Sequence, residues 1–199
     1  MNTLSICEAI AGIRGDAVIV GTMGSMVAFD KLGVKDGRIN SVPLMGGAAS
    51  LGLGIALAHP QRKVLIVDGD ASLLMQLGGL AGVVAQAPRN LYHFVVNNGV
   101  QFAGLYNLDV AGKGRVDFAG LARAAGYASS QRFSELAPFA KDLPGILAAG
   151  GPAFVELVVE PEKSIFGKEH PQTEVPERQF TRMGDEARAL GAWLQRTGQ

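Results

Sequence analysis

The sequence predicts an α/β fold, a doubly wound and mostly parallel sheet with helices on both faces. The first observation is that residues 63–67 are apolar and β-branched without alternation, which indicates a strand buried on both faces. The second is that the neighbouring stretches have the composition and spacing of helices, with a further strand at residues 91–96. The third is that polar residues follow both strands, at the edge where doubly wound sheets bind ligands.

The first half of the chain is expected to alternate helices and strands. We expect a helix at residues 3–13, a strand at 17–20, a helix at 26–32, a helix at 53–58, a strand at 63–67, a helix from 73 to about 86 and a strand at 91–96. Gly15 ends the first helix. His59 and Pro60 end the third, because proline biases its predecessor out of the α region. Residues 33–40 are interpreted as a polar connector.

The second half is less regular. We expect an irregular loop at residues 100–107, a helix at 116–127, a helical region at 133–149 interrupted by Pro138 and Pro144, a strand at 154–159, a polar arm at 164–177 and a terminal amphipathic helix at 185–196. The terminal helix would dock on the body or on a partner. We therefore expect a single domain over residues 1–199, with 164–199 as its C-terminal arm and helix.

Composition excludes several classes of function. The chain has 199 residues, with 18 basic and 18 acidic side chains and no net charge, so nothing favours nucleic acid or an anionic membrane as a partner. Cys7 is the single cysteine, which excludes an internal disulfide or a cysteine-ligated cluster within these residues. The first residues lack the basic region of a signal peptide and no apolar run is long enough to span a membrane. We expect a cytoplasmic protein.

Two polar strand ends predict a metal and anion site. Asp70 follows the strand at 63–67, and Asn97, Asn98 and Gly99 follow the strand at 91–96. A carboxylate, an amide oxygen and backbone carbonyls suit Mg²⁺ or Ca²⁺ rather than zinc. Free N–H groups at the start of the helix that contains Ser72 add an anion site. A metal beside an anion indicates a diphosphate, whereas an Asp cap and an Asn-Gly turn would be the purely structural interpretation.

These residues resemble the signature of thiamine diphosphate enzymes. The resemblance is carried by Leu53-Gly54, Pro60, Leu65, Val67, Gly69-Asp70-Ala71-Ser72 and Asn97-Asn98. Ala71 departs from the family, which more often has glycine there. Residues 45–57 and 166–180 resemble decarboxylases of sulfopyruvate and phosphonopyruvate, so the resemblance spans most of the chain. The chain departs from them after Asn98, where residues 104–108 are more apolar, which hints at a less anionic substrate.

The resemblance implies a set of site residues. Asp70, Asn98 and the carbonyl of Val100 would hold the metal. Met45 would prop thiamine diphosphate into its bent shape, although methionine is also a common core filler. The further residues expected at the cofactor are Thr22, Gly24, Ser25, Pro43, Gly69, Ala71, Ser72, Gln101 and Phe102. The Thr22 to Ser25 cluster could equally be a helix N-cap.

A partner chain is expected because the activating glutamate is missing. In the family this glutamate lies on a separate pyrimidine-binding domain, and 199 residues leave room only for the diphosphate-binding domain. The sequence thus predicts the β subunit of a two-chain, Mg²⁺-dependent 2-oxoacid decarboxylase. A pyrimidine-binding α subunit would supply the glutamate, in a hetero-oligomer with two copies of each chain or more. The substrate would be a small 2-oxoacid.

Two other functions stay open at this point. A carboligase subunit of the acetolactate synthase type would use the same parts, and a nucleotide- or phosphate-binding module without turnover would need only the anion site. The histidines do not decide between them. His93 is interpreted as a packed core residue, and His170 lies in the arm, where it could fold over an active site.

Overall fold

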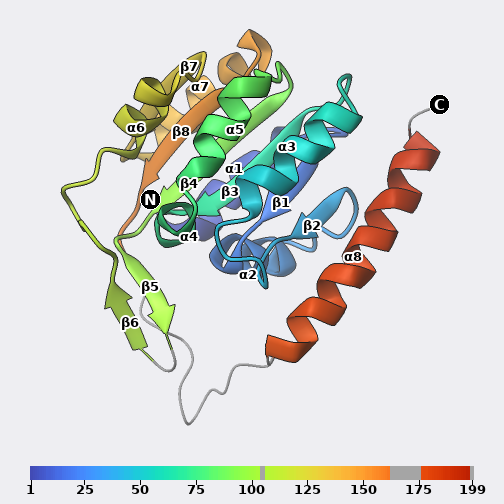
Figure 1. Cartoon of the computed structure of the whole chain (residues 1–199), viewed down its shortest axis with the longest axis horizontal. Helices are drawn as coiled ribbons and strands as arrows, with labels where there is room; N and C mark the ends of the chain where they lie inside the picture. Colours follow the sequence, from blue (N-terminus) through green and yellow to red (C-terminus); the bar gives the residue numbers. More distant parts are fainter. Residues whose placement is uncertain (104–105, 162–175, 198–199) are drawn as a thin grey trace.

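The computed structural model describes residues 1–103, 106–161 and 176–197, and it confirms the doubly wound α/β fold (Figure 1). The sheet strands are β1 (Val18–Gly21), β2 (Arg38–Asn40), β3 (Val64–Gly69), β4 (Leu91–Asn97), β7 (Ser129–Phe133) and β8 (Ala153–Val158). Within the described residues they form one six-stranded sheet in the order β2-β1-β3-β4-β8-β7, and every neighbouring pair is parallel. All their carboxyl ends therefore lie at one edge of the sheet.

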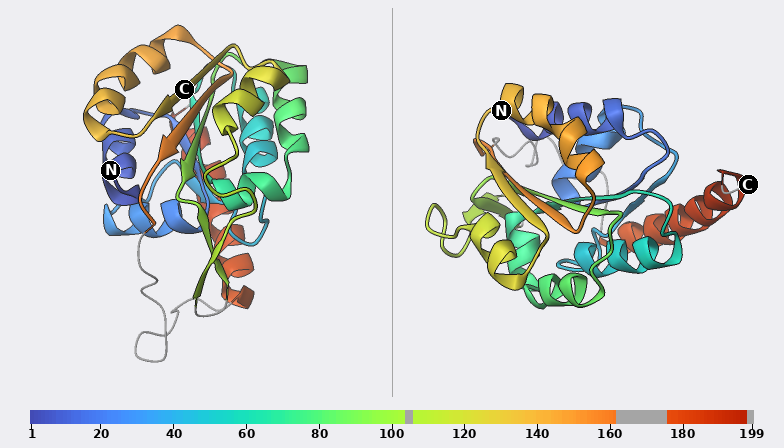
Figure 2. Two further views of the ribbon diagram at one scale, coloured as in Figure 1. Left: turned by 90° about the vertical axis from the view of Figure 1, so that its left-hand side faces the viewer. Right: turned by 90° about the horizontal axis from the view of Figure 1, so that it is seen from above.

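Helices cover the sheet on both sides (Figure 2). They are α1 (Thr3–Ile13), α2 (Met23–Lys31), α3 (Ala48–Ala58), α4 (Asp70–Met75), α5 (Gly78–Gln86), α6 (Phe118–Ala125), α7 (Leu136–Ala149) and α8 (Pro176–Thr197). One hydrophobic core lies between the sheet and α1, α2 and α7, and a second between the sheet and α3, α5 and α6. Successive residues of β3 enter opposite cores, and all four from Val64 to Val67 are fully buried. This confirms the interpretation of residues 63–67.

The two edge strands were not predicted. β2 lies inside the expected connector 33–40, and β7 lies between the expected helical regions 116–127 and 133–149, with only Phe133 inside the second. Neither strand has an apolar run: β2 is three buried residues of which two are polar, and β7 is a largely polar strand with no fully buried residue. In β2 the buried Arg38 is held by an ion pair with Asp30 of α2. Such tertiary support cannot be read from local composition.

Other boundaries also differ from the expectation. The helix expected from residue 73 is two helices, because Gln76 leaves the helical region at φ −147°. The break lets Gly79 pack closely on α3, where an added Cβ would lie 3.2 Å from that of Ala49. α7 continues through Pro144. β5 (Val100–Ala103) and β6 (Tyr106–Asp109) pair as antiparallel strands, where an irregular loop was expected at residues 100–107.

The terminal helix α8 lies along the β2 edge of the sheet (Figures 1 and 2), and its Leu190 belongs to the second core. It is longer than expected, since it begins at Pro176. Trp193 packs on Gly37, which has φ +63°, and the guanidinium of Arg62 stacks 4.7 Å from the centre of the Trp193 ring. No helix in the described ranges has the length and hydrophobicity of a membrane span. The predicted arm and His170 lie outside the described residues.

Candidate functional site

The ends of β3 and β4 meet through Asp70. This residue is the first of α4 and is only 2% exposed. Its Oδ1 accepts a hydrogen bond from the backbone N–H of Ala71 at 2.9 Å, and its Oδ2 accepts one from the N–H of Gly99 at 2.7 Å. The second bond joins the two strand tips that the sequence predicted to converge.

A tight turn after β4 presents this N–H group. Gly99 has φ +68°, a conformation that favours glycine, and an added Cβ would also lie 3.0 Å from the side chain of Lys113. The half-buried Asn98 stabilises the turn, because its Oδ1 accepts a hydrogen bond from the N–H of Val100 at 3.0 Å. Asn98 and the start of β5 at Val100 are thereby held beside Asp70.

The electrostatics of Asp70 suit a cation. Burial raises the pKa of its carboxyl group, although the N–H groups of Ala71 and Gly99 oppose the shift, and the charge of Asp68 raises the pKa further. No basic side chain in the described part of the chain forms an ion pair with Asp70, and no three His, Cys, Asp or Glu residues there group as metal ligands. The residues present instead offer one carboxylate, one amide oxygen and backbone carbonyls. This donor set fits Mg²⁺ or Ca²⁺.

The loop at Met45 lies against the same site. The Oγ of Ser72 accepts a hydrogen bond from the N–H of Gly46 at 3.2 Å. Gly46 has φ +83°, and an added Cβ there would lie 2.9 Å from the Cβ of Gln76. Met45 itself is 69% exposed, so it is not a core filler. The apolar side chain is therefore free to contact a bound molecule.

The Thr22 cluster forms a helix cap. α2 begins at Met23 rather than at residue 26, with Thr22 as its N-cap. The buried Oγ of Ser25 accepts a hydrogen bond from the N–H of Thr22 at 2.8 Å and donates one to the carbonyl of Val67 at 2.7 Å. The hydroxyl of Ser25 is thus engaged within the fold, whereas Gly24 is exposed. Thr22 lies beside Gly69, where an added Cβ would be 3.9 Å from its Oγ1, so β1 reaches the site as well.

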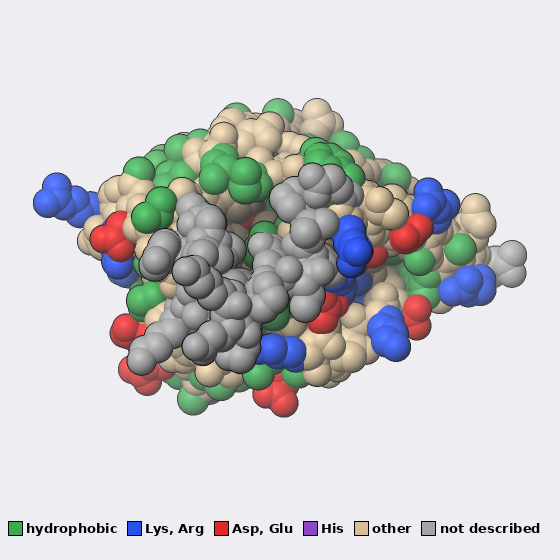
Figure 3. Space-filling view, turned by 90° about the horizontal axis from the view of Figure 1, so that it is seen from below, with side chains coloured by type: hydrophobic (Ala, Val, Ile, Leu, Met, Phe, Trp, Pro, Cys, Tyr) green, Lys and Arg blue, Asp and Glu red, His purple; other side chains and the backbone are tan. Residues whose placement is uncertain are grey.

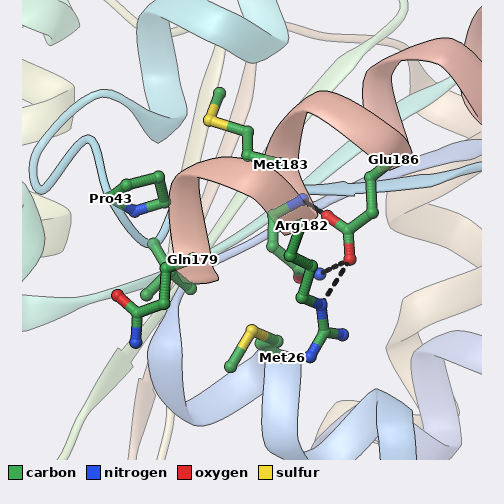
Figure 4. A pocket seen from close by; sticks show the side chains of 8 residues that line it. Met26, Pro43, Gln179, Arg182, Met183 and Glu186 are labelled. Atoms are coloured by element: carbon green, nitrogen blue, oxygen red, sulfur yellow. Dashed lines mark hydrogen bonds and ion pairs between the residues drawn. The ribbon is translucent and has the colours of Figure 1, made fainter. Parts of the chain in front are cut away.

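Pro43 lines a small pocket at the ends of β1 and β2 (Figure 4). The first turns of α8 form the opposite wall, where Glu186 accepts hydrogen bonds from the backbone N–H and the Nδ2 of Asn40. Figure 3 looks onto the carboxyl edge, which hydrophobic, acidic and basic side chains border. Gln101 is half-buried in β5, and the side chain of Phe102 lies outside the described residues.

Sequence reasoning missed the buried polar side chains behind these strand ends. Glu156 of β8 is fully buried and accepts hydrogen bonds from the Nδ2 of Asn97 at 2.8 Å and the N–H of Ala119 at 3.1 Å. It ties the end of β4 to the start of α6. The available signal was a carboxylate within the apolar run 154–159. His93 is fully buried, which confirms its interpretation as a core residue.

Comparisons with known proteins agree with this geometry. A family model described as thiamine pyrophosphate enzyme, C-terminal TPP binding domain, matches residues 37–157. Over 155 residues the chain is 40% identical to a phosphonopyruvate decarboxylase of Streptomyces viridochromogenes, a match that covers 76% of the chain and 38% of the relative. Over 165 residues it is 30% identical to the sulfopyruvate decarboxylase subunit beta of Methanothermobacter thermautotrophicus, covering 81% of the chain and 83% of the relative.

A solved structure shares the fold. The thiamine diphosphate-dependent 4-hydroxybenzoylformate decarboxylase of Rhodococcus jostii superimposes with a TM-score of 0.66 at 22% identity, over 82% of this chain and 33% of that one. The chain thus spans well under half the length of this enzyme and of the phosphonopyruvate decarboxylase. It spans most of the length of the sulfopyruvate decarboxylase subunit.

Proposed function

Since this chain belongs to the thiamine pyrophosphate enzymes, as their C-terminal TPP-binding domain, we propose that it is the β subunit of a two-chain, Mg²⁺-dependent 2-oxoacid decarboxylase. The observation that carries the proposal is the hydrogen bond from the N–H of Gly99 to Asp70. It holds two strand ends around a buried carboxylate that lacks a positive partner among the described residues. A divalent cation with a diphosphate would supply that partner.

The proposal assigns a role to each predicted site residue. Asp70, Asn98 and the carbonyl of Val100 hold the metal. The residues proposed to contact the cofactor are Thr22, Gly24, Ser25, Pro43, Met45, Gly69, Ala71, Ser72, Gln101 and Phe102. Ser25 acts through its neighbours, because its hydroxyl is bonded to Val67 and Thr22. Met45 supports the cofactor from the side, which its exposure and its distance from the core favour.

The chemistry follows from this arrangement. When bound, thiamine diphosphate supplies the electron sink for loss of CO₂ from a 2-oxoacid. The residues of this chain hold the metal and diphosphate end and exclude water from the buried carboxylate of Asp70. Decarboxylation is favoured over carboligation because relatives with 30–40% identity over most of the chain are named as decarboxylases. A putative acetolactate synthase large subunit of Mycobacterium tuberculosis, which covers 74% of the chain, is only 27% identical. A small 2-oxoacid is the proposed substrate class.

The proposal includes a partner chain. The relative that matches over 83% of its own length is named as a subunit beta, which supports a matching pyrimidine-binding α subunit here. That subunit would supply the activating glutamate in a hetero-oligomer with two copies of each chain or more. Residues 1–199 would then form one diphosphate-binding domain, and the active site would lie between chains.

Calorimetry tests the cofactor assignment. The chain assembled with its co-purified partner should bind thiamine diphosphate only when Mg²⁺ is present, and the chain alone should bind it more weakly, because the proposed site lies between chains. Asp70→Ala should weaken this binding by at least about 100-fold, since loss of a mere outer-shell partner of a metal ligand already costs about 10–100-fold. Asp142→Ala is the matched control, because Asp142 is exposed on α7. Unchanged binding by Asp70→Ala, or a preference for ATP in the wild-type chain, would refute the proposal.

A further inference from the structure

A chain of three buried polar side chains lies in the core behind Asp70. Asp68 is 1% exposed, His93 is 0% exposed and Tyr127 is 6% exposed. The Nε2 of His93 lies 3.3 Å from Oδ2 of Asp68, and its Nδ1 lies 3.3 Å from the hydroxyl of Tyr127. Neither His93 nor Tyr127 has a hydrogen bond to a proposed cofactor residue among the bonds of the described part of the chain.

The directions of these hydrogen bonds follow from the chemistry of each group. A carboxylate only accepts, so Nε2 of His93 carries a proton and donates to Asp68. Burial raises the pKa of Tyr127, and the charge of Asp68 raises it further, so the phenol keeps its proton. In the imidazole tautomer with its proton on Nε2, Nδ1 can only accept, and the hydroxyl of Tyr127 donates to it. Phe154 packs edge-on against the imidazole with 5.1 Å between ring centres. The ring is thereby fixed in orientation.

The other oxygen of Asp68 reaches the site. Its Oδ1 accepts a hydrogen bond from the backbone N–H of Gly69 at 2.8 Å. Gly69 is the N-cap of α4 and directly precedes Asp70. Asp68 therefore bonds on one side to the imidazole and on the other to the peptide that orients Asp70.

A buried carboxylate is costly unless all its hydrogen bonds are satisfied. Valine or isoleucine would fill this position of β3 at lower cost, as they do at residues 64, 66 and 67. We propose that His93 is a positioning residue, which through Asp68 and the N–H of Gly69 holds the turn that presents Asp70 to the metal. This inference rests on the proposed function only in naming the metal.

Three substitutions test the inference. His93→Leu removes the donor to Asp68, whereas His93→Gln places an amide N–H near the position of Nε2. Phe154→Leu is the control, because Phe154 contacts the same imidazole and lies in the same core but makes no hydrogen bond to Asp68. Each variant is made in the full chain and assembled with the partner that accompanies the wild type.

The first measurement is the dissociation constant of Mg²⁺ at saturating thiamine diphosphate. His93→Leu should weaken Mg²⁺ binding by about 10–100-fold, as expected for an outer-shell partner of a metal ligand. His93→Gln should recover most of this loss, and Phe154→Leu should bind Mg²⁺ as the wild type does. Equal losses in His93→Leu and Phe154→Leu would show a merely structural role and overturn the inference.

The second measurement needs no ligand. Amide hydrogen exchange at Gly69 should be at least about tenfold faster in His93→Leu than in Phe154→Leu, because only the former frees Asp68 from its buried partner. If His93→Leu does not fold, Tyr127→Phe removes only the donor to Nδ1 and should change exchange in the same direction by about threefold. Exchange at the wild-type rate would overturn the inference. A wild-type assembly that binds no thiamine diphosphate would instead refute the proposed function.

Discussion

At the scale of single residues, backbone N–H groups hold Asp70 in place. Both of its oxygens accept backbone N–H groups, one from α4 and one from the turn after β4. These bonds fix the carboxylate, yet burial and Asp68 still leave its pKa raised. The carboxylate is thus fixed in position, but its negative charge has no basic partner among the described residues, so a bound cation would stabilise it strongly.

This state predicts a pH dependence of metal binding. A proton and Mg²⁺ compete for Asp70, and its pKa lies above the ordinary value of 3.8. Mg²⁺ affinity should therefore fall as the pH is lowered through this raised pKa, before an ordinary aspartate would protonate. Without metal, lowering the pH should instead stabilise the fold, because the buried ionised carboxylate of Asp70 opposes folding and its protonation removes this cost. The stabilisation of the chain by Mg²⁺ and thiamine diphosphate in thermal unfolding, measured at falling pH, checks this expectation. A stabilisation that stays constant until the pH reaches the ordinary pKa of an aspartate would contradict it.

Some parts of the site could be predicted from the sequence, and others could not. The meeting of the ends of β3 and β4 could be predicted because strand ends of a parallel sheet lie at one edge, and the hydrogen bond from the N–H of Gly99 to Asp70 joins them. The roles of Ser72 and Asn98 in the site stay predictions. Asp68, His93 and Glu156 were not assigned to the site, because the sequence does not show which side chains or N–H groups they meet. Their partners are on other strands and helices, which only the tertiary structure brings close.

At the scale of elements, central strands were predictable and edge elements were not. β3 and β4 are buried on both faces, so their apolar runs identify them. β2 and β7 are short and polar, and their pairing with β1 and β8 defines them. The hairpin of β5 and β6 follows the positive φ of Gly99, and the sequence indicated the turn but not the strands.

α8 is attached to the β2 edge by a polar network. Arg182 of α8 and Arg38 of β2 both bind Asp30 of α2, and Glu186 binds Asn40. Burial alone would raise the pKa of Asp30, but hydrogen bonds from the two arginines outweigh it, so the pKa is lowered. A lowered pKa contributes stability above the ordinary value of 3.8, and this contribution is lost as the pH falls through the lowered pKa.

Asp30→Asn should therefore loosen α8 at neutral pH. Asp30 has a side chain that is 40% exposed, so solvent screening limits the loss to about 1 kcal/mol or less. Amide exchange in α8 should then speed up by about fivefold or less, and the emission of Trp193, the single tryptophan, should shift to longer wavelength. Asp185→Asn is the control, because the ion pair of Asp185 with Arg188 lies within α8 and is exposed, and does not join α8 to the sheet. Equal effects of both substitutions would contradict the role of Asp30.

At the scale of the whole molecule, apolar side chains remain exposed around the carboxyl edge. Leu44 is 46% exposed, Met45 69%, Met75 50% and Leu77 38%. The loop that contains Met45 and the break between α4 and α5 are in contact, since an added Cβ on Gly46 would lie 3.3 Å from the Cβ of Met75. A partner seated over the metal site would cover these side chains, whereas helices and sheet already bury the rest of the two cores.

The proposed assembly therefore predicts a difference between two exposed leucines. Leu44 lies at the carboxyl edge, and Leu57, which is 49% exposed, lies in the last turn of α3 at the opposite end of the sheet. Either leucine to aspartate should change the stability of the free chain by only about 0.5 kcal/mol, because both are exposed. Leu44→Asp should nevertheless weaken assembly with the pyrimidine-binding partner by at least about tenfold, since a buried, unpaired carboxylate at an interface is costly. Sedimentation of the chain with its partner measures this, and equal weakening by Leu57→Asp would mean that the partner does not sit over the metal site. Leu44→Asp, but not Leu57→Asp, should also lose cofactor binding when it loses assembly. This result would show that cofactor binding depends on assembly, because a site that lies between chains cannot retain its cofactor when the chains separate.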